Sequence, residues 1–305
     1  MSTFRKIDFS GRLKLRIDEE LKVLKTGRAT GKGENLVMNE SLASRLAILI
    51  FVFQSVFSHA TERLVLVGGG DLPKAAVAKI SDWAGGKKAT ILVISWGTET
   101  PEESFAYFKE NILPFQPASI EAAPVKTETA QEQDLFLSQL GRATGVYFSG
   151  GDQNRIMAHI KKDRLILNAL NKRFREGIVF AGTSAGTAIM SNTMLTGNAD
   201  LTVIDPTKSE VSEGLGVLKN AVLDQHFLKR QRVNRLFSVL MKSPETIGIG
   251  IDEGTALAIE DSRMAQVVGP GMVMVVDASE RPGKFGVHLL QMGESFDLVT
   301  QKKMD

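Results

Sequence analysis

The sequence predicts an α/β protein with a doubly wound, mostly parallel sheet and helices on both faces. Three observations predict it: β-branched runs alternate with amphipathic stretches, the 245 residues from 61 to 305 suffice for one core, and the composition is globular. Of the 305 residues, 43% are apolar, 24% are charged and none is cysteine. Disulfides, thiolate metal sites and cysteine nucleophiles are therefore excluded.

The elements of the predicted sheet follow one another in a regular order. Short β-branched and apolar runs predict strands over Leu64–Val67, Thr90–Ser95, Ser119–Ala122, Gly145–Ser149 and Ile178–Ala181. Amphipathic periodicity predicts helices over Lys74–Ala84, Glu102–Asn111, Gln131–Leu140 and between Gln153 and Arg175. After Ser191 we expect an irregular segment, then a helix over Leu228–Met241 and strands over Ile247–Ile251, Thr255–Ile259, Ala265–Val268 and Met272–Asp277.

Residues 38–60 are predicted to be a signal peptide. A polar stretch ends at Arg45, an apolar run continues to Phe57, and small residues precede a cleavage point after Ala60. The run is shorter than the roughly 20 residues of a membrane-spanning helix. A retained membrane-anchoring helix and a first core helix are the alternatives. We expect a secreted or periplasmic protein that has no membrane contact after processing.

The charge distribution separates the basic beginning of the chain from a neutral body. Residues 1–37 carry 9 Lys and Arg against 5 Asp and Glu, whereas residues 61–305 carry 27 against 29. The first segment is either an extension foreign to the natural protein, which would then start at Met38, or part of a long signal peptide. The neutral body predicts no nucleic-acid partner, because such binding needs a clustered basic face.

Function is expected at the carboxyl ends of the predicted strands, where an open parallel sheet collects its ligands. The first such place, Gly68-Gly69-Gly70-Asp71, lacks the glycine spacing of a phosphate-binding loop, since Pro73 stands where the third glycine belongs. We interpret it as a tight turn that passes close to its neighbours.

The second place is Gly182-Thr183-Ser184-Ala185-Gly186, a G-x-S-x-G motif between a strand and a helix. This context is typical of a nucleophile elbow, whose flanking glycines avoid Cβ clashes in the sharp turn. Ser184 is therefore the candidate nucleophile, and a simple helix N-cap is the alternative. The backbone N–H group of Ala185 would help to hold an oxyanion.

The third place is Ser149-Gly150-Gly151-Asp152-Gln153, which also follows a predicted strand. Gly151 can offer a bare N–H group to an oxyanion, and Gln153 can offer its amide to a substrate. The alternative is a turn in which Asp152 caps the next helix.

A base for the serine must come from four histidines. His59 lies in the leader, His159 is predicted on a solvated helix face, and His288 lies inside a strand. His226, in Asp224-Gln225-His226-Phe227, has the expected strand-end position and is the first choice. Asp252 and Glu253 end a later strand, and one of the two would orient the imidazole, because neighbouring strand residues point to opposite faces.

Together these motifs resemble cyanophycinases. The resemblance covers residues 62–290 and rests on four motifs in the family's order: Gly150–Gln153, Gly182–Gly186, Asp224–Phe227 with the following arginines, and Gly248–Glu253. It implies a serine exopeptidase with a class I glutamine amidotransferase-like fold, usually a homodimer, that releases β-Asp-Arg dipeptides from cyanophycin. A true glutamine amidotransferase is excluded by the missing cysteine.

The resemblance also implies roles for individual residues. Ser184 would be the nucleophile, His226 the base and Glu253 the orienting acid. Substrate-binding residues would be Gln153, Asp224, Gln225, Arg230, Arg232 and Arg235. Guanidinium groups suit the α-carboxylates of a polyaspartate backbone, although a basic solvated helix is the alternative reading of the arginines.

Three other functions fit parts of the sequence. A related aspartyl dipeptidase would share the fold and the elbow, and the poorly matching segment from Asn192 to Leu218 would set the substrate. An α/β-hydrolase-type esterase would pair Ser184 with Asp261 and His288. A binding module on the same fold would have no turnover. We expect no metal and no cofactor, since the sequence has no H-E-x-x-H motif and no close His/Asp cluster.

Overall fold

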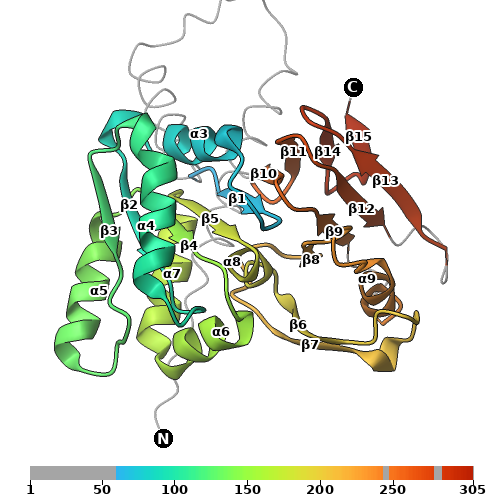
Figure 1. The fold of residues 1–305 in the computed structure, drawn as a ribbon, viewed down its shortest axis with the longest axis horizontal. Coiled ribbons are helices and arrows are strands. Elements are labelled where there is room, and N and C mark those ends of the chain that lie inside the picture. Colours follow the sequence, from blue (N-terminus) through green and yellow to red (C-terminus); the bar gives the residue numbers. More distant parts are fainter. Residues whose placement is uncertain (1–59, 243–246, 278–283, 305) are drawn as a thin grey trace, which may run out of the picture. The chain divides into compact units, whose positions relative to one another are not determined.

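A computed structural model describes residues 60–242, 247–277 and 284–304 (Figure 1). The predicted basic extension and all of the predicted signal peptide except Ala60 lie outside the described residues. Within the described chain, the predicted alternation of strands and helices is confirmed between residues 63 and 183.

The main sheet has nine strands in the order β15-β14-β11-β10-β1-β5-β4-β2-β3. Its parallel half consists of β1 (Arg63–Val67), β5 (Val179–Thr183), β4 (Gly145–Phe148), β2 (Thr90–Ile94) and β3 (Ser119–Ala122). Antiparallel strands extend it on the β1 side: β10 (Ala256–Glu260), β11 (Met264–Val268), β14 (Ser295–Asp297) and β15 (Lys302–Met304). Apolar side chains line both faces of the parallel half, so both need covering.

Helices cover both faces of the parallel half, as the alternating pattern predicts. On one face α3 (Lys74–Trp83) and α4 (Pro101–Ile112) pack against Val65, Val93 and Tyr147. The other face is covered by α5 (Ala130–Arg142), α6 (Gln153–Lys162), α7 (Arg164–Arg175) and α8 (Ala185–Ala188). The helical stretches predicted between Gln153 and Arg175 are α6 and α7, which meet at Asp163, where its carboxylate accepts the Leu165 N–H at 2.7 Å and caps the second helix.

A second sheet, which the sequence did not separate from the first, holds the strands that precede His226 and Glu253. Its order is β13-β12-β9-β8, with β8 (Ala221–Gln225) parallel to β9 (Ile247–Ile251) and antiparallel additions β12 (Val273–Asp277) and β13 (Gly286–Leu290). Helix α9 (Val233–Leu240) packs on this sheet. In the segment predicted as irregular, β6 (Thr193–Ala199) pairs with β7 (Ser209–Glu213).

Helix α9 begins five residues later than the amphipathic pattern predicts. The Arg230 N–H donates to the His226 carbonyl and the Arg232 N–H to the Phe227 carbonyl, both at 2.9 Å. Gln231 has a φ of 53°, which a right-handed helix does not allow. A tight turn after His226 therefore replaces the first helical turns.

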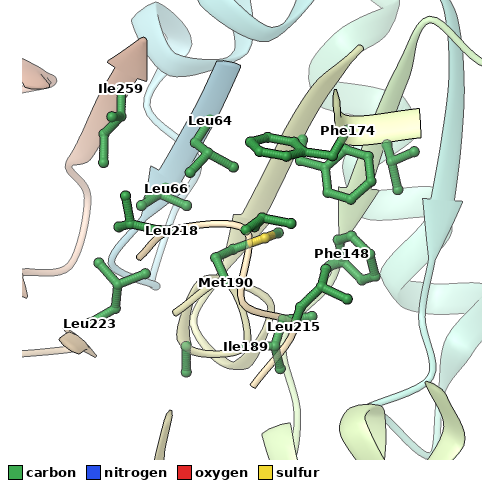
Figure 2. Close-up of a cluster of buried hydrophobic side chains, with 14 of the residues drawn as sticks. Leu64, Leu66, Phe148, Phe174, Ile189, Met190, Leu215, Leu218, Leu223 and Ile259 are labelled. Carbon is green, nitrogen blue, oxygen red and sulfur yellow. The ribbon is translucent and has the colours of Figure 1, made fainter. Parts of the chain in front are cut away.

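One continuous apolar core joins the two sheets (Figure 2). Leu64 and Leu66 of β1, Leu223 of β8, and Ile189 and Met190, which follow α8, all belong to it. Because proteins pack their interiors to near-crystalline density, this shared core fixes the position of one sheet against the other. The carboxyl ends of β5, β8 and β9 consequently keep fixed positions relative to one another.

Candidate active site

Ser184 stands at a sharp turn between β5 and α8. Its φ of 52° and ψ of −112° lie outside the usual regions for a residue with a side chain. A Cβ atom on Gly182 would lie 2.3 Å from the Gly186 carbonyl oxygen, and one on Gly186 would lie 2.2 Å from the Phe148 carbonyl oxygen. Both glycines are required by these close approaches, as the elbow motif predicts.

The structure brings together the three side chains that the sequence singled out. The Nε2 atom of His226 lies 2.8 Å from the Ser184 Oγ atom, and its Nδ1 atom lies 2.6 Å from Oε1 of Glu253. Ser184 comes from the main sheet, whereas the other two follow β8 and β9 of the second sheet. Asp252 is not part of this chain of hydrogen bonds, because its carboxylate accepts the Lys229 N–H at 3.0 Å.

The environment of His226 keeps its imidazole in the neutral form that can accept a proton. The side chain is 7% exposed, and burial, the largest effect, lowers its pKa below the usual value. The hydrogen bond to Glu253 acts in the opposite direction, while the nearby charges of Arg230 and Arg232 lower the pKa further. With one ring nitrogen on a carboxylate and the other on a hydroxyl, this arrangement can activate Ser184 as a nucleophile.

Two backbone N–H groups stand beside the serine. A Cβ on Gly150 would lie 3.6 Å from the Ser184 Cβ, so the loop after β4 is adjacent to the elbow. Gly151 has a φ of 124°, and a Cβ there would lie 2.2 Å from the Gly97 carbonyl oxygen. Neither the Gly151 N–H nor that of Ala185 donates a hydrogen bond to another described residue. Both groups are therefore available to an oxyanion.

Gln153 and Asp152 serve mainly to attach the loop to its surroundings. The Gln153 Nε2 group donates to the Leu195 carbonyl of β6 at 2.9 Å, and the side chain is buried. One N–H of this amide therefore holds β6, and the predicted offer of the amide to a substrate stays a prediction. Asp152 accepts the Asn154 N–H at 2.7 Å and caps α6, as the alternative interpretation predicted.

The arginines predicted to bind substrate divide into a buried one and two accessible ones. Arg235 donates through Nε to Asp224 Oδ2 at 2.7 Å and through Nη2 to Oδ1, and both residues are at most 2% exposed. The pair is closed off from solvent in this structure, and its predicted contact with substrate stays a prediction. Burial raises the pKa of Asp224, and Arg235 opposes that rise.

Arg232 and Arg230 lie closer to the surface. Arg232 donates through Nη1 to the Gln225 backbone carbonyl at 2.7 Å and also to the Gln225 side-chain oxygen. Gln225 is itself buried and orients Arg232 through these bonds, and its predicted contact with substrate stays a prediction. Arg230 is exposed on the turn that follows His226. The buried Asp224 carboxylate interacts with Arg235 and Arg232, and Arg230 lies near enough to Arg232 to lower its pKa, so three guanidinium groups gather at this corner of the site.

One residue near the elbow was missed by the sequence analysis. The buried Thr187 hydroxyl lies 2.7 Å from the Val67 carbonyl oxygen and 2.9 Å from that of Gly182, and it can donate to either. It ties the end of β1 to the end of β5 beneath the serine. The sequence gives little sign of this role, because a threonine at the start of an apolar helix fits that helix equally well.

The esterase alternative is contradicted by the structure. His288 Nε2 lies 2.8 Å from Asp277 Oδ2 in the second sheet. Asp261 accepts the Glu62 N–H at 2.9 Å, next to the start of β1 and hence at the edge opposite Ser184. His159 also differs from expectation: it is half-buried and stacks on Trp96 with ring centroids 4.0 Å apart. Among the described residues, no group of three His, Asp or Glu side chains could hold a metal ion.

Comparison with known proteins places this site in a family. Residues 64–267 match peptidase family S51. A cyanophycinase of Trichormus variabilis is 30% identical over 227 residues, which cover 73% of this chain and 76% of that protein. One of Geminocystis herdmanii is 27% identical over 260 residues, or 79% of this chain and 95% of that protein.

A solved structure shares the fold. The crystal structure of a peptidase from an acI-B1 Actinobacterium superposes with a TM-score of 0.62 at 22% identity, covering 80% of this chain and all of that one. The predicted α/β fold class is confirmed by this likeness together with the sheet order. From the extent of the family match and of the cyanophycinase relatives, the chain belongs to peptidase family S51.

Proposed function

We propose that this serine exopeptidase hydrolyses cyanophycin to β-Asp-Arg dipeptides, with Ser184 as nucleophile, His226 as base and Glu253 as orienting acid. The observation that carries the proposal is the chain of hydrogen bonds Ser184–His226–Glu253 within a member of this peptidase family. The cyanophycinase relatives support the choice of substrate.

The reaction is an acyl transfer to the serine followed by hydrolysis. His226 takes the Ser184 proton through Nε2 as Oγ attacks the scissile carbonyl carbon. The N–H groups of Gly151 and Ala185 stabilise the oxyanion, and His226 returns the proton to the leaving amine. A water molecule, activated by the same imidazole, then releases the acyl group. Glu253 stabilises the imidazolium that forms in each half of the reaction.

Substrate recognition is proposed for the positively charged corner beside His226. Arg232 is held by Gln225, Arg230 is exposed, and the charges of both lower the pKa of His226, so two guanidinium groups lie near the triad. The polyaspartate backbone of cyanophycin presents carboxylates, which guanidinium groups bind with two parallel hydrogen bonds. The buried Asp224–Arg235 pair supports this corner by holding β8 and α9 together.

The proposed cellular location and assembly rest on the predicted signal peptide and on the family resemblance. We propose that residues 38–60 direct export and are removed, which gives a secreted or periplasmic homodimer. The predicted signal sequence supports the location, and the family resemblance supports the dimer. In the described part of the chain, no helix is both long and apolar enough to cross a membrane.

The test is to incubate the purified protein with insoluble cyanophycin beside the Ser184→Ala variant and to identify soluble products by mass spectrometry. β-Asp-Arg dipeptide is expected only from the unmodified protein, and Ser184→Ala should lose at least about 3 kcal/mol of transition-state stabilisation. Near-normal turnover by that variant would refute the role of Ser184. Absence of dipeptide, with Ser184 still labelled by a fluorophosphonate, would move the substrate to small aspartyl peptides.

A further inference from the structure

The turn that links β1 to α3 is hydrogen-bonded to all three segments that carry the triad. We call residues 67–70 the β1 turn. Three successive carbonyl groups of this turn accept N–H groups: Val67 from Ser184 at 3.1 Å, Gly68 from His226 at 2.6 Å, and Gly69 from Gly254, the residue after Glu253, at 2.9 Å. The turn therefore connects the main sheet with both strand ends of the second sheet.

The same turn approaches two of the triad side chains closely. A Cβ atom on Gly69 would lie 2.2 to 2.8 Å from three ring atoms of His226. One on Gly70 would lie 3.1 Å from the Cβ of Glu253. The ring of His226 thus rests directly on the bare backbone of Gly69, in space that a side chain would take.

The triad needs such external support because two of its members have strained backbones. Ser184 and His226 have φ values of 52° and 48°, in the left-handed region that residues with side chains rarely adopt. Strain of this kind persists only where surrounding contacts hold it. The Val67 and Gly68 carbonyls bind the N–H groups of these two residues.

We propose that the β1 turn is the template that sets the relative positions of Ser184, His226 and Glu253, and that Gly69 is a positioning residue for the His226 ring. This inference rests on the proposed catalytic role of the triad. The turn touches no scissile bond and supplies no proton. It acts because its carbonyls fix the three backbones and its missing side chain leaves room for the imidazole.

The test compares two alanine variants at glycines that have nearly the same φ. Gly69 has a φ of 106° and Gly85, in the loop before β2, has a φ of 107°, but a Cβ on Gly85 would meet only the Ala89 nitrogen at 4.0 Å. Labelling of Ser184 by a fluorophosphonate, which forms an Oγ–P bond and expels fluoride, reports the geometry of the triad without polymer binding. We expect Gly69→Ala to slow labelling at least about 100-fold and Gly85→Ala to change it less than about twofold, by comparison with triad defects in serine proteases.

The pH dependence separates positioning from general damage. In the unmodified protein the labelling rate should rise as His226 loses its proton. Gly69→Ala should lose that dependence, because a displaced ring no longer reaches Ser184. In cyanophycin hydrolysis, kcat should fall while KM stays unchanged, since the arginines proposed to bind substrate lie outside the β1 turn.

A second matched pair covers the case in which Gly69→Ala does not fold. Gly70 and Gly86 have φ values of 68° and 60°, and a Cβ on Gly86 would meet nothing within 4 Å. Gly70→Ala requires only a small shift of Glu253. We expect it to be labelled about tenfold more slowly than Gly86→Ala, because a displaced Glu253 loses part of its effect as the orienting acid. Equal rates within the folded pairs would overturn the proposal. Failure of the unmodified protein to be labelled would instead contradict the proposed function.

Discussion

At His226, one carboxylate opposes the combined effect of burial and two guanidinium groups on the pKa of the imidazole. Burial and the guanidinium groups of Arg230 and Arg232 lower its pKa, and the Glu253 carboxylate raises it. A lowered pKa keeps the base unprotonated at a more acidic pH than an ordinary histidine would allow. The pH profile of Ser184 labelling therefore shows the effect of each neighbour when that neighbour is replaced by itself.

Replacing Arg230 by Gln should move the midpoint of that profile to higher pH. Removing a positive charge relieves the repulsion of the imidazolium, so the pKa of His226 rises, by less than about one unit because Arg230 is exposed and screened. Fluorophosphonate labelling between pH 4 and 9 measures the midpoint. Lys229→Gln is the matched control on the same turn and should leave it unchanged. A midpoint that stays fixed or falls in Arg230→Gln would contradict this electrostatic account.

Glu253→Gln should have two effects of different kind. The labelling rate should fall at least about 100-fold, because the amide neither fixes the imidazole tautomer nor stabilises the imidazolium. The midpoint should move to lower pH, since the Glu253 carboxylate raises the pKa of His226. Asp252→Asn, one residue earlier, removes a carboxylate that binds only a backbone N–H, and its labelling should stay near normal. A large loss in Asp252→Asn with a small one in Glu253→Gln would reverse the assignment of the orienting acid.

The strand β8 and the helix α9 are joined by the buried Asp224–Arg235 pair. Arg235→Met should destabilise the protein by about 3 to 5 kcal/mol, because it leaves the Asp224 carboxylate buried without its partner. The cost should be largest at neutral pH and smaller in acid, since protonation removes the buried charge. Urea unfolding at pH 7 and pH 5 measures both.

A double variant tests whether the charge or the packing matters in this pair. Asp224→Leu combined with Arg235→Met removes both ions and should recover part of the lost stability, as apolar replacements of buried pairs do. A loss below about 1 kcal/mol in the single Arg235 variant would show that the pair contributes little to joining β8 and α9.

The domain from residue 61 onward should fold without the first 60 residues. The predicted cleavage point follows Ala60, and the first strand of the main sheet begins only at Arg63. A protein of residues 61–305 is therefore expected to unfold cooperatively at the same temperature as the longer chain and to be labelled at the same rate. Mass spectrometry of the exported protein should give Thr61 as the first residue. A retained leader, or a lower unfolding temperature after its removal, would contradict this division of the chain.

Much of the molecule follows from patterns that are local in the sequence. The periodicity of apolar residues determined the helices and strands from residue 63 to 183, because amphipathic faces and turn sterics involve neighbours only. Ser184 could be chosen since the elbow needs glycines at fixed offsets, and His226 because few histidines exist and only one ends a strand.

What only the tertiary structure decided depends on contacts between distant residues. The assignment of β8 and β9 to a second sheet, the choice of Glu253 over Asp252, and the burial of Asp224 with Arg235 all arise where separate elements pack together. No local pattern specifies which of two adjacent carboxylates faces a ring 27 residues away, or which of three arginines pairs with the buried Asp224. Sequence chemistry named the reacting groups, and the packing of two sheets around the β1 turn brought them within hydrogen-bonding distance.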